Sequence, residues 1–441
     1  MDLNPINRRT FFDRVSDGLY GVGLSSLLMQ DLYGEKPHHS APLPINTKPR
    51  KPHFSPKARA VIQFCMQGGP SQVDLFDPKP ALEKYHGKNA PEEFTRVAPA
   101  GRSMKGKVMR SHWKFAQYGQ SGAWVSELLP HTAKEIDQIA IIRSMFNVHE
   151  NHEPACYKWQ SGETFPGHPT MGAWITYGLG SVNQNLPSYV VLADPNNKFA
   201  VNGVENWMSG YLPPLFQGTS IKSEGTPMLH LKPDYEEPAG VTAAKRNLIN
   251  ALDFLHKAKR PNQPVLDSRI ANYQMAARMQ VEATEALDVL REKEGTRAMY
   301  GIGEKETDNF GKRCLMARRL VERGVRFVQI YPQGQKWDNH DNIKTTLPAA
   351  CRESDKPCAA LLRDLRQRGL LDDVLVLWGG EFGRLPMAQG DYAKAGRDHG
   401  PSGFTNWMAG GGVKGGVVYG ETDDIGFGAV KDRVSIQDWH A

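Results

Sequence analysis

Cysteine is scarce in this sequence of 441 residues, and the cysteines that are present form no C-x-x-C pair. The five positions are Cys65, Cys156, Cys314, Cys351 and Cys358. An odd and scattered set argues against a framework of disulfides and against a zinc site built from thiolates. A metal ion would therefore have to be held by histidine and carboxylate side chains.

Long apolar runs and dense basic stretches are also missing. No apolar run reaches the ~18 residues that a membrane-spanning helix needs, so we expect no stable membrane span. The 54 lysines and arginines are interspersed with 48 aspartates and glutamates, which leaves a net charge of only +6. Because no basic stripe carries interleaved aromatic residues, we expect no nucleic acid partner.

The residues that are present indicate a globular protein. Hydrophobic residues make up 40% of the chain and charged residues 23%, and there are 9 tryptophans. This mixture excludes collagen-like, coiled-coil and largely disordered chains. Because domains usually contain ~100–200 residues, the length suits one large α/β domain or two smaller ones, with a sizeable core in either case.

The N-terminal region predicts an export signal followed by a linker. Arg8 and Arg9 precede two phenylalanines, and a moderately apolar stretch follows over 18–29. This order is typical of a twin-arginine signal, which takes folded proteins across a membrane. We therefore expect residues 1–34 to be such a signal, the export machinery to be a partner, and the protein to be periplasmic or extracytoplasmic. The alternative is an ordinary amphipathic first helix in a cytoplasmic protein. Residues 35–57, rich in proline and basic side chains, predict a linker.

Short apolar runs bounded by turn residues predict the strands of a sheet. The runs cover 60–66, 139–142, 186–193, 325–331 and 374–378, with further apolar segments at 408–413 and 417–419. Near-continuous apolar character is typical of parallel strands that are covered on both faces. We therefore expect an α/β fold with a central, mostly parallel sheet sandwiched between helices.

Helices are predicted between these strands, where helix formers dominate or apolar residues recur at helical spacing. These segments are 124–137, 241–298, 308–323 and 344–368. We expect Pro357 to interrupt the last of them. Residues 195–240 are rich in glycine, proline and asparagine, and they predict an excursion at about 195–300 inserted in a single domain over 58–441.

Polar side chains follow several predicted strands, at the edge where ligands bind in α/β sheets. They are Ser71 after the first strand, Asn151 and His152 after the second, Asp338 and His340 after 325–331, Glu381 and Arg384 after 374–378, and Arg397, Asp398 and His399 downstream. Imidazole nitrogens and carboxylate oxygens suit a divalent metal, with Zn, Mn, Mg and Ca all open. Such an ion can polarise a phosphoryl or sulfuryl oxygen and lower the pKa of water.

Each of these side chains also has an ordinary alternative role. Asp338 can be a turn residue, Glu381 a salt-bridge partner of Arg384, Asp398 a turn cap and His399 a surface histidine. Their recurrence at one predicted edge of the sheet favours the metal site.

Several motifs together resemble the bacterial family called domain of unknown function 1501. They are GGPSQVDLFDPKP (68–80), NHEPA (151–155), HPTMGAWITYGLGS (168–181), WDNHDN (337–342), GGEFGR (379–384), GRDHGP (396–401) and GGGVKGGVVYGETD (410–423). That family is grouped with the alkaline phosphatase and sulfatase superfamily. The resemblance therefore implies an alkaline-phosphatase-like fold and a metal-assisted phosphate- or sulfate-ester hydrolase site.

The resemblance also implies roles for individual residues. Asp338 and His340 match positions that bind a first metal, and His399 matches the histidine that completes this site. Glu381 matches an acidic position that usually joins a second metal with a neighbouring histidine, but here Phe382 follows it. The second metal site is therefore altered.

Further roles are expected around this site. We expect Glu381 and Asp398 to complete or orient the metal centre, and Arg384 and Arg397 to hold the anionic group of the substrate. Asn151 is a further candidate for substrate binding.

The sequence also departs from the superfamily. The C/S-x-P-x-R signature, whose first residue becomes formylglycine in sulfatases, does not occur, so a formylglycine sulfatase is not expected. Ser71, a metal-bound water and His152 remain open as the nucleophile. Residues 435–441 resemble the start of a helix that relatives continue, so we expect a truncated C-terminus.

These observations favour an exported metal-dependent hydrolase of phosphate or sulfate esters, acting on a small molecule or a glycan. The alternative is a catalytically degenerate fold that serves as an extracytoplasmic carbohydrate-binding or scaffold protein. A phosphotransferase similar to phosphoglycerate mutase is a third hypothesis, because the fold alone does not choose the activity.

Overall fold

The structure is a computed structural model that describes residues 46–95, 106–193, 201–223, 240–260 and 263–441. The export signal predicted over 1–34 lies outside the described residues, as does the first part of the linker predicted over 35–57.

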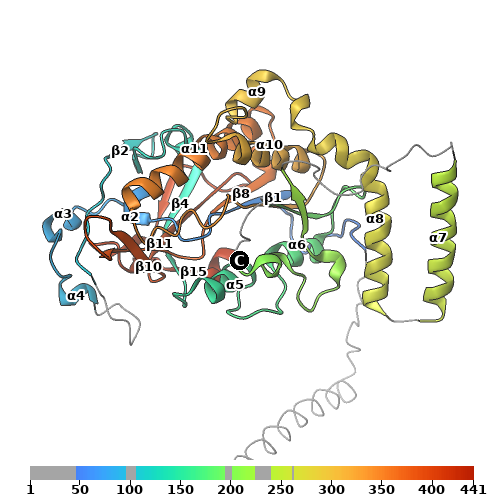
Figure 1. Ribbon diagram of the computed structural model, residues 1–441, viewed down its shortest axis with the longest axis horizontal. Helices are drawn as coiled ribbons and strands as arrows, with labels where there is room; N and C mark the ends of the chain where they lie inside the picture. Colours follow the sequence, from blue (N-terminus) through green and yellow to red (C-terminus); the bar gives the residue numbers. More distant parts are fainter. Residues whose placement is uncertain (1–45, 96–105, 194–200, 224–239, 261–262) are drawn as a thin grey trace, which may run out of the picture. The chain divides into compact units, whose positions relative to one another are not determined.

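Strands and helices alternate along the described chain (Figure 1). The strands are β1 (Ala60–Cys65), β2 (Phe115–Tyr118), β3 (Ala123–Ser126), β4 (Ile139–Phe146), β5 (Tyr189–Ala193), β6 (Thr219–Lys222), β7 (Phe327–Ile330), β8 (Val374–Gly379), β9 (Gly383–Gln389), β10 (Gly396–Gly400), β11 (Phe404–Ala409), β12 (Val417–Tyr419), β13 (Glu421–Thr422), β14 (Ala429–Lys431) and β15 (Val434–Ser435). The α-helices are α2 (Gln72–Leu75), α3 (Ala81–Tyr85), α4 (Glu92–Thr95), α5 (His152–Ser161), α6 (Met171–Leu179), α7 (Val241–Ala258), α8 (Pro264–Leu287), α9 (Glu294–Met299), α10 (Asp308–Glu322), α11 (Ile343–Gln367) and α12 (Ile436–His440). The 3-10 helices are η1 (Thr132–Gln138), η2 (Gly203–Trp207), η3 (Pro214–Phe216), η4 (Val289–Arg291) and η5 (Leu371–Asp373).

A nine-stranded sheet forms the centre of the fold. Its strand order is β12-β4-β11-β8-β1-β7-β5-β6, and β15 also pairs with β4. β11 runs antiparallel to both of its neighbours, β4 and β8, whereas the other pairs described in this sheet are parallel. The predicted central, mostly parallel sheet is therefore confirmed.

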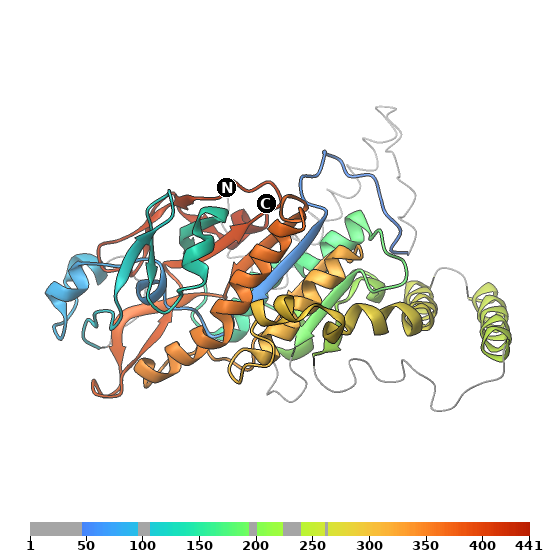
Figure 2. The same ribbon diagram turned by 90° about the horizontal axis from the view of Figure 1, so that it is seen from above.

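The central strand β1 explains why its sequence is continuously apolar. All six of its residues are buried, and successive side chains enter different cores. Ile62 belongs to the core that contains Phe310 of α10, whereas Val61 belongs to the core that contains Trp159 of α5. Helices α10 and α11 lie side by side over one face of the sheet, and α5 and α6 cover the other (Figures 1 and 2).

The prediction of a helix over 124–137 is wrong for the first half of this segment. Residues 123–126 form β3, which pairs with β2 in a two-stranded sheet, and a 3-10 helix follows at η1. Gly119 and Gly122 have φ values of 66° and 64°, which allow the tight turn between the two strands. Val125 is buried while Trp124 is exposed, an alternation with the period of a strand.

Helix α11 runs through Pro357 without interruption, which contradicts the predicted break. Pro348 and Pro357 both lie inside the helix. A proline inside a helix costs ~3 kcal/mol because it removes a hydrogen bond and crowds the preceding turn. α11 packs against α10 and η1, and this tertiary packing outweighs the local cost.

The region predicted as an excursion contains both strand and helix. β6 adds an edge strand beside β5, which the sequence did not indicate. The helical character predicted over 241–298 is confirmed by α7, α8 and α9.

None of the helices that the structure describes combines the length and the apolar character needed to cross a membrane.

All five cysteines are free and buried. Burial raises the pKa of Cys65 to about 12, and it raises the pKa values of the other four thiols well above their ordinary value. Because the thiolate is the reactive form, we expect the folded chain to react very slowly with Ellman's reagent and all five thiols to react once urea unfolds it. Rapid labelling of any thiol in the folded chain would contradict this expectation.

Candidate metal centre

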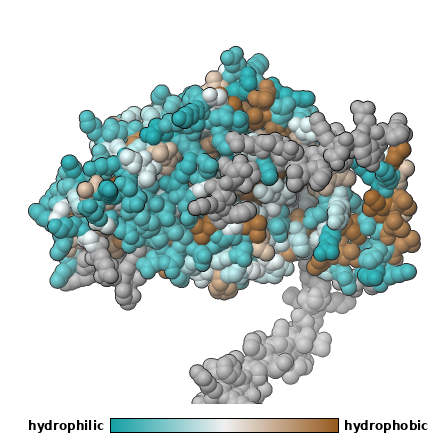
Figure 3. Space-filling view, viewed as in Figure 1, coloured by the Kyte–Doolittle hydropathy of each residue, from teal (hydrophilic) through white to brown (hydrophobic). Residues whose placement is uncertain are grey.

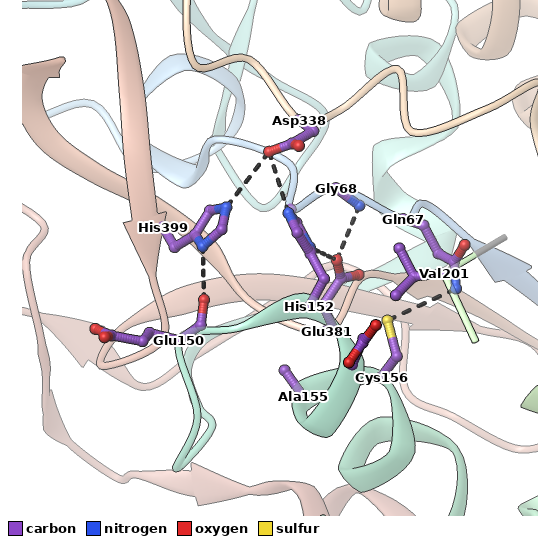
Figure 4. A network of polar contacts seen from close by, with 12 residues as sticks. Gln67, Gly68, Glu150, His152, Ala155, Cys156, Val201, Asp338, Glu381 and His399 are labelled. Carbon is purple, nitrogen blue, oxygen red and sulfur yellow. Dashed lines mark hydrogen bonds and ion pairs between the residues drawn. The ribbon is translucent and has the colours of Figure 1, made fainter. Parts of the chain in front are cut away.

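Four side chains converge at one edge of the sheet: His152, Asp338, His340 and His399. Each offers one potential ligand atom, and these atoms all lie within 4.8 Å of one another. We call these four residues the His/Asp cluster. Figure 4 shows His152 and His399 both directed at Asp338.

The sheet brings these residues together. His152 is the first residue of α5, which follows β4, and Asp338 and His340 lie between β7 and α11. β4 and β7 run in the same direction, so their carboxyl ends meet at one edge. His399 lies in β10 of the β9–β10 hairpin, which leads into the reversed strand β11. A register shift between Arg397 and His399 marks a bulge, a feature that commonly redirects side chains at functional sites.

Three imidazole nitrogens approach a single oxygen. Asp338 Oδ1 lies 2.9 Å from His340 Nε2, 3.2 Å from His152 Nε2 and 3.4 Å from His399 Nε2. The Nε2 atoms of His340 and His399 are 2.8 Å apart. Three nitrogens and one carboxylate oxygen therefore surround one point.

The second nitrogen of each imidazole faces an acceptor that fixes the ring. The three contacts are His152 Nδ1 to Glu381 Oε1 at 2.6 Å, His399 Nδ1 to the backbone oxygen of Glu150 at 2.6 Å, and His340 Nδ1 to Gln389 Oε1. In the neutral tautomer that carries its hydrogen on Nδ1, each ring donates to this oxygen and directs its Nε2 lone pair at the centre of the cluster. Oxygen acceptors behind the rings are the usual support of metal-binding histidines.

Arg384 places a fixed positive charge behind Asp338. Its guanidinium is fully buried and donates to Asp338 Oδ1. It also donates to the backbone oxygens of Gly68, Gly69 and Arg397. We predicted that Arg384 holds the anionic group of a substrate, and in the structure these contacts direct its donors at the protein itself.

The electrostatics of the cluster favour positive charge on His152 and His340 but not on His399, where burial lowers the pKa of the imidazole. Burial alone would raise the pKa of the Asp338 carboxyl, but its close contacts with the three imidazoles and the charge of Arg384 hold this pKa well below its usual range. Burial also opposes charge on His152, yet its contacts with Asp338 and Glu381 raise the pKa of this imidazole to about 9. Protons or a metal ion can supply the positive charge, and the two compete for the same nitrogens.

The cluster fits a divalent metal ion. Three imidazole nitrogens and one carboxylate oxygen are ligands of the kinds that proteins use for Zn²⁺, whereas Mg²⁺ and Ca²⁺ prefer oxygen ligands. His152 Nε2 is buried without a well-directed hydrogen bond among the described residues, although Asp338 Oδ1 is 3.2 Å away. A nitrogen left in this state is suited to bind an ion.

Glu381 and Asp398, which we predicted to complete or orient the metal site, lie around the cluster rather than within it. Glu381 is fully buried and contacts His152 Nδ1. Asp398 Oδ1 accepts the backbone N–H of His399 at 2.8 Å and lies 3.9 Å from His340 Nδ1. Both carboxylates therefore face the outer nitrogens of the rings, where they can orient the imidazoles.

Ser71 and Arg397 belong to a buried network centred on Asp74. Ser71 Oγ donates to Asp74 Oδ2 at 2.6 Å. Arg397 holds the same carboxylate through Nε at 2.6 Å and Nη2 at 3.1 Å, and all three side chains are fully buried. The predicted nucleophile and the second predicted anion-binding arginine are thus engaged inside the protein.

Asn151, the third candidate for substrate binding, is exposed at the start of α5 beside His152.

Two contacts of the cluster were missed by sequence reasoning. Gln389 ends β9 and reaches His340 only because of the hairpin geometry. Glu150 contacts His399 Nδ1 through its backbone oxygen, and a backbone contact cannot be predicted from the residue type.

Gly68, in the loop after β1, contacts the loop after β8 through Glu381 and the loop after β7 through Asp338. Its N–H donates to Glu381 Oε1 at 2.9 Å (Figure 4). Its φ of 111° lies in the region that favours glycine, and a Cβ on it would lie 2.3 Å from the backbone nitrogen of Asp338. The glycine pair of the 68–80 motif is therefore a signal for this close approach.

We expect Glu381→Gln to weaken zinc binding ~10–100-fold, the usual effect of changing an acceptor behind a metal-binding histidine. The amide keeps the size of the carboxylate but removes the charge that orients His152. Competition with a chelating indicator measures the affinity. The matched control is Glu153→Gln, which changes an exposed carboxylate in the first turn of α5 and should leave the affinity unchanged. Equal affinities in parent and Glu381→Gln would contradict the orienting role.

Comparisons with known proteins place the chain in a family. Similar solved structures include the sulfatase PsFucS1 from Pseudoalteromonas sp., with 11% identity, a TM-score of 0.36, and coverage of 84% of this chain and 66% of that one. They also include the alkaline phosphatase from the Antarctic bacterium TAB5, with 8% identity, a TM-score of 0.31, and coverage of 83% and 95%. The phosphonate monoester hydrolase SpPMH from Silicibacter pomeroyi has 10% identity, a TM-score of 0.31, and coverage of 67% and 66%.

The search of curated proteins found no match. The sequence profile of the family described as "Protein of unknown function (DUF1501)" matches residues 58–441. As the motifs indicated, the chain belongs to the DUF1501 family.

Proposed function

We propose that this chain is a metal-dependent hydrolase of phosphate or sulfate esters that acts outside the cytoplasm. The observation that carries the proposal is the convergence of three imidazole Nε2 atoms on Asp338 Oδ1, with an oxygen acceptor behind every ring. The motif resemblance to the alkaline phosphatase and sulfatase superfamily supports the choice of ester hydrolysis.

The His/Asp cluster would hold the ion through His152, Asp338, His340 and His399. A divalent ion at this place supplies Lewis-acid activation of an ester oxygen or of water. We favour Zn²⁺ among Zn, Mn, Mg and Ca because three of the four donors are imidazole nitrogens.

The surrounding residues set the charge and the orientation of the cluster. Glu381 can hold the hydrogen on His152 Nδ1, which keeps Nε2 free of it. Arg384 orients Asp338 and offsets its charge. Both act from fully buried positions, where they exclude water from behind the cluster.

We favour water over Ser71 as the nucleophile. Ser71 Oγ is fully buried, and its hydrogen bond to Asp74 is part of the ion pair with Arg397. Freeing this hydroxyl would require the Asp74 network to open. His152 is less suited because both of its ring nitrogens face carboxylates.

Export remains part of the proposal and rests on the sequence around Arg8 and Arg9. The partners we propose are the twin-arginine export machinery and an ester of a small molecule or a glycan. Cell fractionation that finds the protein only in the cytoplasm would overturn this part.

The hydrolase proposal is tested with chromogenic esters. The full chain, loaded in turn with Zn, Mn, Mg or Ca, is assayed with nitrophenyl phosphate, bis-nitrophenyl phosphate and nitrophenyl sulfate. We expect turnover of at least one ester, loss of turnover in His340→Ala, and unchanged turnover in His53→Ala, which changes an exposed histidine far along the sequence from the cluster residues. A folded, metal-loaded parent that hydrolyses none of the three would overturn the proposal.

The burial of Ser71, Arg384 and Arg397 also favours a second candidate, a degenerate hydrolase fold that binds carbohydrate or serves as a scaffold outside the cytoplasm. In that case a metal-loaded chain would be inactive on every ester but would bind defined glycans on an array. A blank array would count against this alternative.

A further inference from the structure

Phe382, the residue directly after Glu381, packs against two rings of the His/Asp cluster. Its ring centroid lies 4.8 Å from that of His152 and 4.7 Å from that of His399. The two imidazoles are themselves 4.3 Å apart and inclined by 69°, and the phenyl plane is inclined to them by 35° and 34°. The three rings therefore form one packed group, in which the phenyl plane makes about half of that angle with each imidazole.

The phenyl ring joins the candidate metal centre to the hydrophobic core. Phe382 is fully buried, and it belongs to the core that contains Trp159 and Phe404. The surface over this side of the molecule is different in character. Figure 3 shows mainly hydrophilic residues where α2, α3 and β10 lie in Figure 1. Phe382 is thus an apolar support next to a polar site, and the core around the ring holds it in place.

Gly69 leaves the space that this ring occupies. A Cβ on Gly69 would lie 2.8 Å from Phe382 Cδ2, and the φ of 89° lies in the region that favours glycine. Any side chain at position 69 would displace the ring or strain the backbone. Gly68 makes room for the backbone of Asp338 in the same way, so the glycine pair supports the centre at two points.

The imidazoles are held at two places, an edge nitrogen and the ring. A contact at Nδ1 anchors one atom, about which the ring plane can still turn. His152 is held at Nδ1 by Glu381 and on its ring by Phe382. His399 is held at Nδ1 by the backbone oxygen of Glu150 and on its ring by Phe382. Because a binding site needs its groups aimed to within ~10–20°, packing contributes to the geometry together with the polar contacts.

We propose that Phe382 is a positioning residue of the metal centre, whose ring holds the imidazoles of His152 and His399 in place. In this orientation both Nε2 atoms face Asp338 Oδ1. Ligands that are already ordered lose less freedom when an ion binds, so the packing raises the affinity for the ion. The inference rests on the metal centre of the proposed function but not on the hydrolysis of an ester.

An ordinary core phenylalanine would stabilise the fold without acting on the ion, and Phe310 supplies the comparison. It is also fully buried, but it lies in α10 and packs against Phe64 in the core that contains Ile62. Phe310→Leu therefore makes the same chemical change in the core, away from the cluster.

The test compares Phe382→Leu with Phe310→Leu in the full chain. We expect Phe382→Leu to weaken zinc binding ~10-fold, the lower end of the effects found for groups that support metal ligands. Phe310→Leu should bind zinc like the parent. Competition with a chelating indicator measures the affinity.

Cobalt(II) loaded in place of zinc gives a readout that a loss of fold stability does not move. Its visible absorption bands depend on where the ligand atoms lie. We expect these bands to change in Phe382→Leu and to stay as in the parent in Phe310→Leu.

Circular dichroism verifies that each variant is folded. If Phe382→Leu does not fold, Phe382→Met fills the space with a flexible side chain and should show the same changes. Zinc affinity and cobalt bands equal to those of the parent would overturn the inference, as would an equal loss in Phe310→Leu. A parent that binds no metal would overturn the centre and this inference together. Weaker binding in Phe382→Leu, in a chain that hydrolyses no ester, would overturn the hydrolase proposal alone.

Discussion

Asp338→Ala is expected to abolish stoichiometric zinc binding by the purified full chain. Asp338 Oδ1 is the oxygen on which the Nε2 atoms of His152, His340 and His399 converge. Without it the centre keeps three imidazoles and the buried positive charge of Arg384. Such a centre repels a cation, so the loss should exceed that from removing a neutral ligand. Elemental analysis after loading with zinc and gel filtration measures the effect.

The control lies in the same loop. Asp341→Ala removes an exposed carboxylate three residues away and should retain the ion. His399→Ala should lose it, because this variant removes a ligand nitrogen from the other side of the site. Retention of metal by both Asp338→Ala and His399→Ala would show that any bound ion lies elsewhere. A folded parent that takes up none of Zn, Mn, Mg or Ca would overturn the metal centre altogether.

Arg397→Met is expected to lower the free energy of unfolding by ~3–5 kcal/mol, the usual cost of removing one partner from a buried ion pair. Arg397 and Asp74 are both fully buried and joined by two hydrogen bonds, at 2.6 and 3.1 Å. After the substitution, the Ser71 hydroxyl is the one remaining hydrogen-bond donor to the Asp74 carboxylate among the described residues. Urea unfolding followed by tryptophan fluorescence measures the change.

Two further variants separate the charge effect from lost packing. Arg59→Met removes an exposed arginine that pairs with Asp373 at the surface and should cost less than ~1 kcal/mol. The double variant Asp74→Leu/Arg397→Met should recover part of the loss, because it removes the unpaired carboxylate as well. A double variant less stable than Arg397→Met alone would indicate that packing, and not the buried charge, dominates.

The strands could be predicted because burial on both faces demands apolar residues at every position, as in β1. Strand direction could not be predicted in the same way. The apolar segment predicted at 408–413 overlaps β11, but nothing in its composition indicates that it runs against its neighbours. The break expected at Pro357 also failed, because the sequence shows the cost of the proline but not the packing of α11 that outweighs it.

For the candidate site, the sequence likewise predicted the choice of residues but not their orientation. Asp338, His340 and His399 were expected to share an ion, and they lie in one cluster with His152, for which a catalytic role was expected. Residue type indicates which side chains can bind a metal, but not which nitrogen of a ring faces the ion. That depends on acceptors such as the backbone oxygen of Glu150, which any residue type could supply.

The position of His399 in the chain determines when the centre can be completed during synthesis. The chain reaches the site with His152, returns with Asp338 and His340, and arrives a last time through the β9–β10 hairpin on its way into β11. A nascent chain that ends before His399 lacks one of the four donors, so the complete site forms only after residue 399 has been synthesised. If the chain is exported in its folded form, as we propose, it acquires its ion before it crosses the membrane. The metal supply of the cytoplasm, and not that of the compartment in which the protein works, would then decide which ion it carries.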